Sequence, residues 1–516
     1  MESKEFDAVV IGAGNGGLTA ALALTYYGQR PLVLEQHNVP GGFASSFVRG
    51  RFEFEPSLHE LREYGPDDDK GEIRKLFESH GVYGEFYPVP DAYRLIIPGE
   101  IDVRMPFGIE AYKAEMERLV PGSSVPVEKY FQLCEDTING FAYIGASGGN
   151  PDPEVLKKEH PNFLKTNPYS LGEVLDAIKM PKRAQLILSA YWCYLGLPVS
   201  KLAFSPFAAM FLTFIRRGAY LPKWRSHQFT NDLAMAIEKK GGKILYNTKC
   251  SEIVVENGGV AGVRTSQGDY IECRHIVANT SMHQVYNELI TPKSEVPPRA
   301  YQNLNARNLG MAGFVVYCGL NKSVDELGIT DYSYFIYPKS TSEETYQSFQ
   351  QMGKDMGIAV TCLNRVIPDA SPEGTCIFEI TTLFESSVWD NVKDTDYHRV
   401  KTEIGLNLVR QFERSTGLSL EPYIEEFEVA TPATFANYTG TWGGAIYGYQ
   451  ASVWDSVMPR LLSLKEDQYI KGLLFSGGYA FKIYGYAATL SSGDTAGKLV
   501  MLAKFAELEE MEAQNE

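Results

Sequence analysis

The stretch "VVIGAGNGGLTAALALTYYGQRPLVLEQHNVPGGF", Val9 to Phe43, decides the fold. Its apolar start predicts a short β-strand, and the Ala- and Leu-rich segment from about Asn15 to Tyr27 predicts a helix that Gly28 ends. The run "PLVLE" predicts a second strand that closes on Glu35. A strand, a glycine turn, a helix and a second strand together indicate a βαβ unit with a parallel sheet.

Three glycines in this unit have the spacing GxGxxG. Gly12 permits the tight turn, Gly14 lets the backbone approach a pyrophosphate, and Gly17 lets the helix pack on the strand. The helix N-terminus attracts the diphosphate through its free N–H groups and its dipole. Glu35 stands 21 residues after Gly14, where an acid binds the ribose hydroxyls and repels the 2′-phosphate of NADP. The motif therefore predicts a dinucleotide site and leaves NAD and FAD open.

The length, charge and cysteine content of the chain limit its possible domain number, partners and location. A chain of 516 residues predicts two or three domains. The 48 basic and 64 acidic residues give a formal net charge of -16, which argues against nucleic acid as a partner. The seven cysteines are odd in number, scattered and never spaced CxxC, so we expect no disulfide framework and no metal site. A reducing cytoplasm is the expected location.

Two segments bear on membranes and secretion. The N-terminal "MESKEFDAVVIG" enters the first predicted strand directly, so no secretory signal is expected. The longest apolar run, Leu202 to Ile215, contains Pro206 and is shorter than the ~20 residues of a membrane-spanning helix. We expect it to form a buried wall. The alternative is a surface element that dips into a membrane interface, with Arg216 and Arg217 at its end, so peripheral membrane contact stays open.

The next stretch, "QHNVPGGFASSFVRGRFEFEPSLHEL", follows Glu35 directly. Here the chain resembles the FAD-binding group of phytoene desaturases, carotenoid isomerases, retinol saturases and, more distantly, amine oxidases. In that group a pair such as Gly41 and Gly42 brings a loop against the FAD. "FEPSLH", Phe54 to His59, resembles a Phe-Asp-x-Gly-x-His stretch beside the flavin, with Glu55 in place of Asp and Ser in place of Gly. Phe43 stands where desaturases and amine oxidases usually carry Arg.

Three later segments carry the same resemblance. The block that ends in "IVANTS" resembles the part that closes the FAD domain, with Ile253 and Val254 over the adenine and Asn279 near the flavin. "GLLFSGGYAFKIYGYAATLSSGDTAGKLV" resembles the last strand, turn and helix along the isoalloxazine. Backbone N–H groups near Tyr486 to Ala488 can stabilise negative charge on the reduced flavin. "TPATFANYTGTWGGAIYG", Thr431 to Gly448, resembles a segment of the isomerase and saturase branch.

The resemblance implies an α/β fold, a Rossmann-like FAD-binding domain with an inserted α+β substrate domain. The FAD domain would comprise residues 1–85, 225–295 and 465–516, and the substrate domain residues 86–224 and 296–464. The expected contacts of FAD are Gly12, Ala13, Gly14, Asn15, Gly16, Gly17, Glu35, Gln36, Gly41, Gly42, Phe43, Ile253, Val254, Asn279, Gly477, Gly478, Tyr486, Ala487 and Ala488.

The insertions are rich in aromatic residues, as in "SAYWCYLGL" and "DYSYFIYPKS". Such stretches are commonly core, but their number in a domain that faces a flavin favours a long apolar cavity that includes Trp192 and Phe214. We expect a long, hydrophobic, unsaturated substrate, either a carotenoid- or retinoid-like polyene or an unsaturated fatty acid. In "GAYLPKWRSHQF", Lys223, Arg225 and His227 either hold a substrate carboxylate or the flavin, or form a solvated loop.

Flavin chemistry needs few side chains, because N5 carries the hydride and a positioned acid or base handles the proton. The candidates for proton transfer are Glu55, His59, Tyr484 and Tyr486. No second GxGxxG follows a predicted strand, so electrons come from an external donor, leave to an external acceptor, or cycle internally.

Three hypotheses remain. The first is an FAD-dependent saturase or isomerase of C=C bonds, an oxidoreductase that acts on CH–CH groups in lipid metabolism. The second is an FAD-dependent desaturase or amine oxidase. The third is a prenyl-lipid-binding escort-like protein without catalysis, which the intact glycine motif and Glu35 disfavour.

Overall fold

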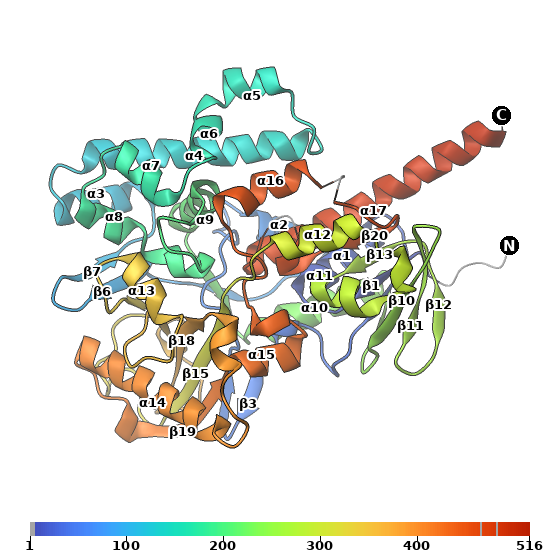
Figure 1. Ribbon diagram of the computed structural model, residues 1–516. Helices are drawn as coiled ribbons and strands as arrows, with labels where there is room; N and C mark the ends of the chain where they lie inside the picture. Colours follow the sequence, from blue (N-terminus) through green and yellow to red (C-terminus); the bar gives the residue numbers. More distant parts are fainter. Residues whose placement is uncertain (1–5, 465–466, 481–482, 516) are drawn as a thin grey trace.

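The computed structural model describes residues 6–464, 467–480 and 483–515, and two large β-sheets dominate it (Figure 1). One sheet has five parallel strands in the order β20-β13-β1-β2-β9. Helix α1 (Asn15–Tyr26) connects β1 to β2, as the βαβ prediction requires. The Rossmann-like part of the predicted fold is therefore confirmed. The strands are β1 (Ala8–Ile11), β2 (Pro31–Leu34), β9 (Lys243–Leu245), β13 (Ile276–Ala278) and β20 (Leu473–Phe475).

The five-stranded sheet is the middle of three layers. Val10 of β1 belongs to the same buried cluster as Leu18 of α1, whereas its neighbour Val9 belongs to a second cluster with Ile253. Successive side chains of a strand point to opposite faces, so each face has its own cover. The helical cover includes α1, α10 (Ser226–Lys239) and α17 (Tyr486–Asn515). The other cover is a four-stranded sheet of β10 (Cys250–Glu256), β11 (Gly259–Thr265), β12 (Tyr270–Glu272) and β14 (Ile290–Thr291).

Helices α1 and α17 pack closely, although 459 residues lie between the last residue of α1, Tyr26, and the first residue of α17, Tyr486. A Cβ atom on Gly497 of α17 would lie 2.6 Å from the carbonyl oxygen of Ala20, so only glycine fits at this contact. Thr19 Oγ1 also donates a hydrogen bond to the carbonyl oxygen of Leu490 at 2.7 Å. The contact fixes the start of α17 beside the glycine turn.

The second large sheet has seven strands in the order β19-β15-β18-β17-β16-β6-β7. All neighbouring pairs are antiparallel except β16 and β6. Helix α14 (Tyr397–Thr416) packs on β15 and β19. This sheet and its helices confirm the expected inserted α+β part. The strands are β6 (Tyr93–Ile97), β7 (Ile101–Met105), β15 (Ala312–Leu320), β16 (Ser333–Ile336), β17 (Ile358–Cys362), β18 (Cys376–Phe384) and β19 (Ile424–Ala430).

The apolar run from Leu202 to Ile215 lies on α9 (Phe204–Arg217), inside a group of helices at the upper left of Figure 1. Phe207 and Phe211 are fully buried, and α9 packs against α4 (Ser124–Ala146). The expected buried wall is confirmed. In the described ranges, no helix has the length and apolar character that crossing a membrane requires.

The remaining short elements connect these layers. The domain bounds stay a prediction, and residues 465–466 and 481–482 lie outside the described residues. The other helices are α2 (Glu72–Ser79), α3 (Ile109–Leu119), α5 (Pro153–Glu159), α6 (Pro161–Thr166), α7 (Leu171–Ala177), α8 (Lys182–Leu188), α11 (Met282–Gln284), α12 (Pro298–Ala306), α13 (Ser342–Ser348), α15 (Pro432–Thr439) and α16 (Val457–Leu462). The other strands are β3 (Phe47–Arg49), β4 (Phe52–Phe54), β5 (Phe86–Pro88) and β8 (Tyr220–Pro222).

Candidate active site

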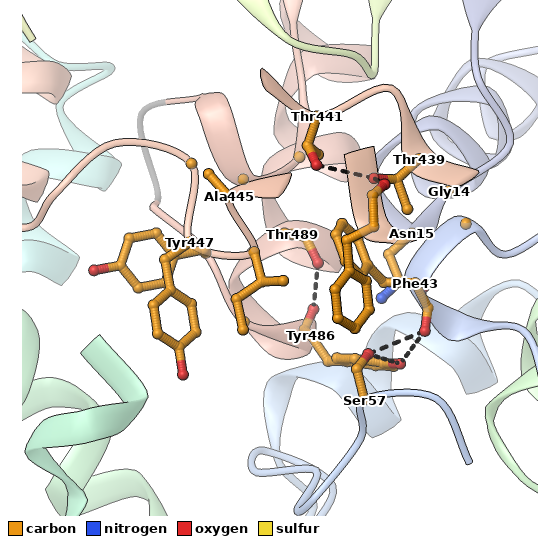
Figure 2. A pocket seen from close by; sticks show the side chains of 18 of the residues that line it. Gly14, Asn15, Phe43, Ser57, Thr439, Thr441, Ala445, Tyr447, Tyr486 and Thr489 are labelled. Carbon is orange, nitrogen blue, oxygen red and sulfur yellow. Dashed lines mark hydrogen bonds between the residues drawn. The ribbon is translucent and has the colours of Figure 1, made fainter. Parts of the chain in front are cut away.

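A cavity of about 340 Å³ connects the glycine turn of the five-stranded sheet to the seven-stranded sheet, and we call it the main cavity. Its first end is lined by the turn after β1 and by Glu35 at the end of β2. Its other walls come from α9, α15, β15, β17 and β18. Figure 2 shows part of this wall, with Gly14, Asn15 and Phe43 on one side and Tyr447 on the other. The sheet topology thus brings a polar end and an apolar wall into one space.

The polar end is built around the carboxylate of Glu35. The backbone N–H of Ala13 donates to Glu35 Oε2 at 2.7 Å, and the backbone N–H of His37 donates to Oε1 at 2.8 Å. These two bonds hold the carboxylate at the edge of the cavity, where Glu35 is 6% exposed. Each carboxylate oxygen keeps a further lone pair for a ligand hydroxyl.

The glycines of the turn make room for the side chain of Asn279, which follows β13. A Cβ atom on Gly14 would lie 2.7 Å from Asn279 Nδ2, and one on Gly16 would lie 2.7 Å from Asn279 Oδ1. Gly17 does not line the cavity; a Cβ atom there would overlap the carbonyl of Gly12, so its role is helix packing. The glycine motif therefore serves both the backbone turn and the approach of Asn279.

The polar end fits an adenine dinucleotide such as FAD. Helix α1 begins at Asn15, and the free N–H groups of its first turn would attract the diphosphate of such a ligand. Asn15 Oδ1 is buried and has no hydrogen-bond partner among the described residues. A ligand that donates a hydrogen bond there would remove an unfavourable buried polar atom. Lys249 and Cys250, at the start of β10, complete this end of the wall.

Most of the predicted FAD contacts line the main cavity, and five do not, Gly17 among them. Ile253 is fully buried in the core between the sheets and Val254 is also absent from the wall, because the cavity meets β10 at its first residue instead. Ala13 and Ala488 do not line it either, although Ala13 contacts Glu35. The predicted residues that do line it are Gly12, Gly14, Asn15, Gly16, Glu35, Gln36, Gly41, Gly42, Phe43, Asn279, Gly477, Gly478, Tyr486 and Ala487.

The loop that contains Gly41 and Gly42 is joined to α17 by hydrogen bonds (Figure 2). Tyr486 Oη donates to the carbonyl oxygen of Phe43 at 2.9 Å, and Ser57 Oγ donates to the same oxygen at 3.1 Å. The two hydroxyls lie 3.2 Å apart. Because Tyr486 has a single hydroxyl proton, this bond leaves it only lone pairs for other partners.

Glu55 was predicted as a proton-transfer residue, but it does not line the main cavity. Its Oε2 accepts from the backbone N–H of Ser226 at 2.7 Å and its Oε1 accepts from Ser226 Oγ at 2.8 Å. Burial raises the pKa of Glu55, while the bonds from Ser226 lower it. Ser226 is the first residue of α10, so the Glu55 carboxyl caps the N-terminus of that helix from another part of the chain.

Lys223, Arg225 and His227 were expected near the flavin or in a solvated loop. None of the three lines the main cavity. Arg225 is 4% exposed and donates to the carbonyl oxygens of Glu53 and Ala370, so it is neither solvated nor available to a ligand. Lys223 pairs with Glu85, and His227 contacts Ser46.

His59 and Glu60 both line the cavity, and only His59 was singled out from the sequence pattern. Burial lowers the pKa of His59 to about 4, and its Nε2 lies 3.0 Å from Thr381 Oγ1. Burial raises the pKa of Glu60 to about 8. Tyr191 Oη lies 3.4 Å from Glu60 Oε2, but it also donates to the carbonyl of Ala92 at 3.0 Å. At neutral pH the imidazole and the carboxyl are therefore both uncharged.

Several aromatic residues line another part of the wall. Tyr484 stacks on Tyr447 with ring centroids 4.8 Å apart, and Tyr484 Oη donates to the carbonyl of Leu195 at 2.6 Å. Phe214 lines the cavity, as expected. Trp192 does not; it is 2% exposed and packs against Tyr337 and Phe349. This part of the cavity suits an apolar ligand.

The fold and the polar end define a dinucleotide-dependent oxidoreductase. The family model of flavin containing amine oxidoreductases matches residues 16–396. The chain belongs to this family, and FAD is its cofactor.

Three similar proteins agree with this assignment. The chain is 23% identical to an all-trans-retinol 13,14-reductase of Danio rerio, over 96% of this chain and 86% of the relative. It is 23% identical to a chloroplastic prolycopene isomerase of Daucus carota, over 86% of this chain and 72% of the relative. The structure of cyclohexylamine oxidase from Brevibacterium oxydans has the same fold, with a TM-score of 0.60, 14% identity, and coverage of 97% and 99% of the two chains.

Proposed function

We propose that the protein is an FAD-dependent enzyme that saturates or isomerises C=C bonds in a long, hydrophobic, unsaturated substrate. The observation that carries this proposal is the continuity of the main cavity, whose polar end lies at the glycine turn and whose remaining wall includes many aromatic and aliphatic residues. The names of two relatives, a retinol reductase and a prolycopene isomerase, support a polyene as the substrate.

FAD would be held by the turn at Gly12 to Gly16, by Glu35 and by the loop at Gly41 to Phe43. Bound FAD supplies hydride transfer at its N5 atom. Tyr486 fixes the Gly41 to Phe43 loop through the carbonyl of Phe43. The aromatic residues of the wall would keep water away from a bound substrate.

We assign the proton donor to Glu60. The hydroxyl protons of Tyr484 and Tyr486 already donate to backbone carbonyls, so neither is free for a substrate carbon. The pKa of Glu60, about 8, keeps its carboxyl protonated at neutral pH. Glu60 Oε1 has no hydrogen-bond partner among the described residues. His59, neutral beside it, would position the substrate or accept a proton in an isomerisation.

The electron partner and the location stay predictions. Saturation of a C=C bond consumes two electrons, so it needs an external electron donor. Isomerisation returns the electrons to the flavin, so it has no net need for a donor. We propose a cytoplasmic protein that collects its substrate by peripheral contact with membranes, because a long apolar substrate partitions into lipid.

A substrate screen tests the proposal. Purified protein should be yellow, and under anaerobic reducing conditions it should convert at least one member of a set of retinoids, carotenoids and polyunsaturated fatty acids. Product analysis by chromatography and mass spectrometry distinguishes the reactions. Oxidation of amines, with no conversion of any polyene, would contradict the proposal.

A further inference from the structure

Arg62 places a guanidinium group in the wall of the main cavity, beside Met210 and Phe214 of α9. Its Nη1 donates to Thr213 Oγ1 at 3.2 Å. Among the described residues, no carboxylate lies within ion-pair distance of Arg62, and its Nε and Nη2 groups make no hydrogen bond. Arg62 is half-buried and is one of the residues that line the main cavity.

Two arginines at the end of α9, Arg216 and Arg217, make ion pairs within the protein. Arg216 pairs with Glu135. Arg217 pairs with Glu63 at 3.2 Å, which engages the acid next to Arg62 in the sequence. Arg62 therefore differs from these two arginines because it lines the cavity and, among the described residues, makes no ion pair.

The other ionisable groups of this wall do not compensate the charge. The pKa of Glu60, about 8, leaves its carboxyl neutral at pH 7, and the pKa of His59, about 4, leaves its imidazole neutral. Burial lowers the pKa of Arg62, but a guanidinium keeps its proton in proteins. The charge of Glu63 acts on Arg62, but Arg62 has no ion pair of its own, so an anion from a ligand would stabilise this half-buried guanidinium.

The anion that fits is not the diphosphate of FAD. The diphosphate position lies at the N-terminus of α1, and Figure 1 shows α9 well apart from α1. The cavity wall also contains aromatic and aliphatic residues, such as Tyr194 and Leu195. Lys249 belongs to the polar end, so Arg62 is a separate cation in a wall with many apolar residues, which matches a ligand with one anionic head group and a long hydrocarbon chain.

We propose that Arg62 binds the carboxylate of a long-chain unsaturated carboxylic acid, so that the free acid, and not the alcohol or the hydrocarbon, is the preferred substrate. The planar guanidinium offers Nε and Nη2 as a pair of donors for the two carboxylate oxygens. The apolar wall then carries the chain toward the flavin, and the distance from head group to flavin selects which double bond reacts. This assignment of substrate class rests on the proposed function.

The test compares three ligands of identical chain: a polyunsaturated fatty acid, its methyl ester and its primary alcohol. Binding to the yellow holoprotein is followed by the change in flavin absorbance, which does not require turnover. Wild-type protein should bind the acid about tenfold more tightly than the ester or the alcohol. Arg62→Gln should remove that preference and leave the affinity for the ester within about twofold. Arg62→Lys should retain part of it.

Arg51→Gln is the matched control, because Arg51 pairs with Glu425 at an exposed position outside the cavity wall. It should keep the preference of the wild type. Equal binding of acid and ester by the wild type, or a full preference in Arg62→Gln, would overturn the proposal. If Arg62→Gln fails to fold, the comparison of the acid with the ester on the wild-type protein still tests the proposal.

The same ligands separate this proposal from the proposed function. Conversion of the ester and the alcohol without any preference for the acid would reject the Arg62 assignment and leave the C=C chemistry intact. A preference for the acid that Arg62→Gln abolishes, without conversion of any ligand, would support the binding site and reject the C=C chemistry.

Discussion

Tyr486 Oη donates a hydrogen bond to the carbonyl oxygen of Phe43 at 2.9 Å. This bond joins the first residue of α17 to the loop after Gly41 and Gly42, which is 443 residues earlier in the chain. Both partners line the main cavity. The Tyr486 hydroxyl therefore links two distant segments directly at the cofactor site.

Loss of that hydroxyl should loosen the cofactor site. Tyr486→Phe removes the bond while Ser57 still donates to Phe43, so we expect an unfolding free energy lower by about 1 kcal/mol. Affinity for FAD should fall by about tenfold. FAD titration of the apoprotein measures this, with Tyr169→Phe as a control at an exposed position. Unchanged FAD affinity in Tyr486→Phe would contradict a role for this bond in holding the loop.

A side chain at Gly14 should abolish cofactor binding. Gly14→Val would bring a Cβ atom to 2.7 Å from Asn279 Nδ2 and displace that side chain from the glycine turn. We expect colourless protein. Gly145→Val, in α4, meets no atom within 4 Å of its Cβ and should stay yellow. The absorption spectrum of each purified variant gives the answer, and a stoichiometric amount of FAD in Gly14→Val would disprove the assignment of the site.

Proton donation by Glu60 predicts a pH dependence with a definite sign. The pKa of Glu60 in the folded protein is about 8, raised from its ordinary 4.5. The carboxyl is therefore protonated below about pH 8, and turnover should fall as the pH rises through that value. Folding stability should also decrease as the pH rises from about 4.5 to 8, because the folded chain retains a proton that the unfolded chain releases.

Glu60→Gln removes both effects. We expect its turnover to be lower by at least about 100-fold and its residual rate to lack the decline near pH 8. Glu110→Gln, where the side chain is 88% exposed, should behave as the wild type. Full activity of Glu60→Gln in a pH-rate profile would exclude Glu60 as the proton donor.

Chain-length selectivity should depend on Phe214 and not on Trp192. Phe214→Ala enlarges the cavity wall, so longer or bulkier substrates should gain relative kcat/KM. Trp192→Ala should lower the unfolding free energy by about 3–5 kcal/mol, since Trp192 is core, with little change in selectivity. Rates measured across a series of chain lengths test both. Equal selectivity in Phe214→Ala and the wild type would show that this wall does not contact the chain.

The sequence predicts the polar end of the site well because its determinants are local. The turn at Gly12 to Gly17 and the acid at Glu35 belong to one βαβ unit, in which spacing along the chain determines distance in space. Glu55 and Glu60 show the limit of such reasoning. They are five residues apart in one loop, yet Glu55 caps α10 and Glu60 faces the cavity. Only long-range packing decides which carboxyl meets the substrate.

Charged residues were the hardest to assign for the same reason. The pattern at Lys223, Arg225 and His227 indicates a basic loop, but backbone carbonyls and nearby side chains bind all three away from the cavity. Arg62 carries no motif, and its lack of an acidic partner is visible only once Glu63 is paired with Arg217. Ile253 does not line the cavity, because the cavity meets strand β10 three residues earlier, at Cys250.

The central claim is that reduced flavin acts on a C=C bond, and product mass after anaerobic incubation tests it most directly. Holoprotein is incubated with a polyunsaturated substrate, with and without dithionite, and the product is weighed by mass spectrometry. We predict turnover only with dithionite, with a gain of about two mass units for saturation or an unchanged mass and a shifted retention time for isomerisation. A loss of about two mass units, seen only with oxidised protein, would contradict the claim and identify a desaturase.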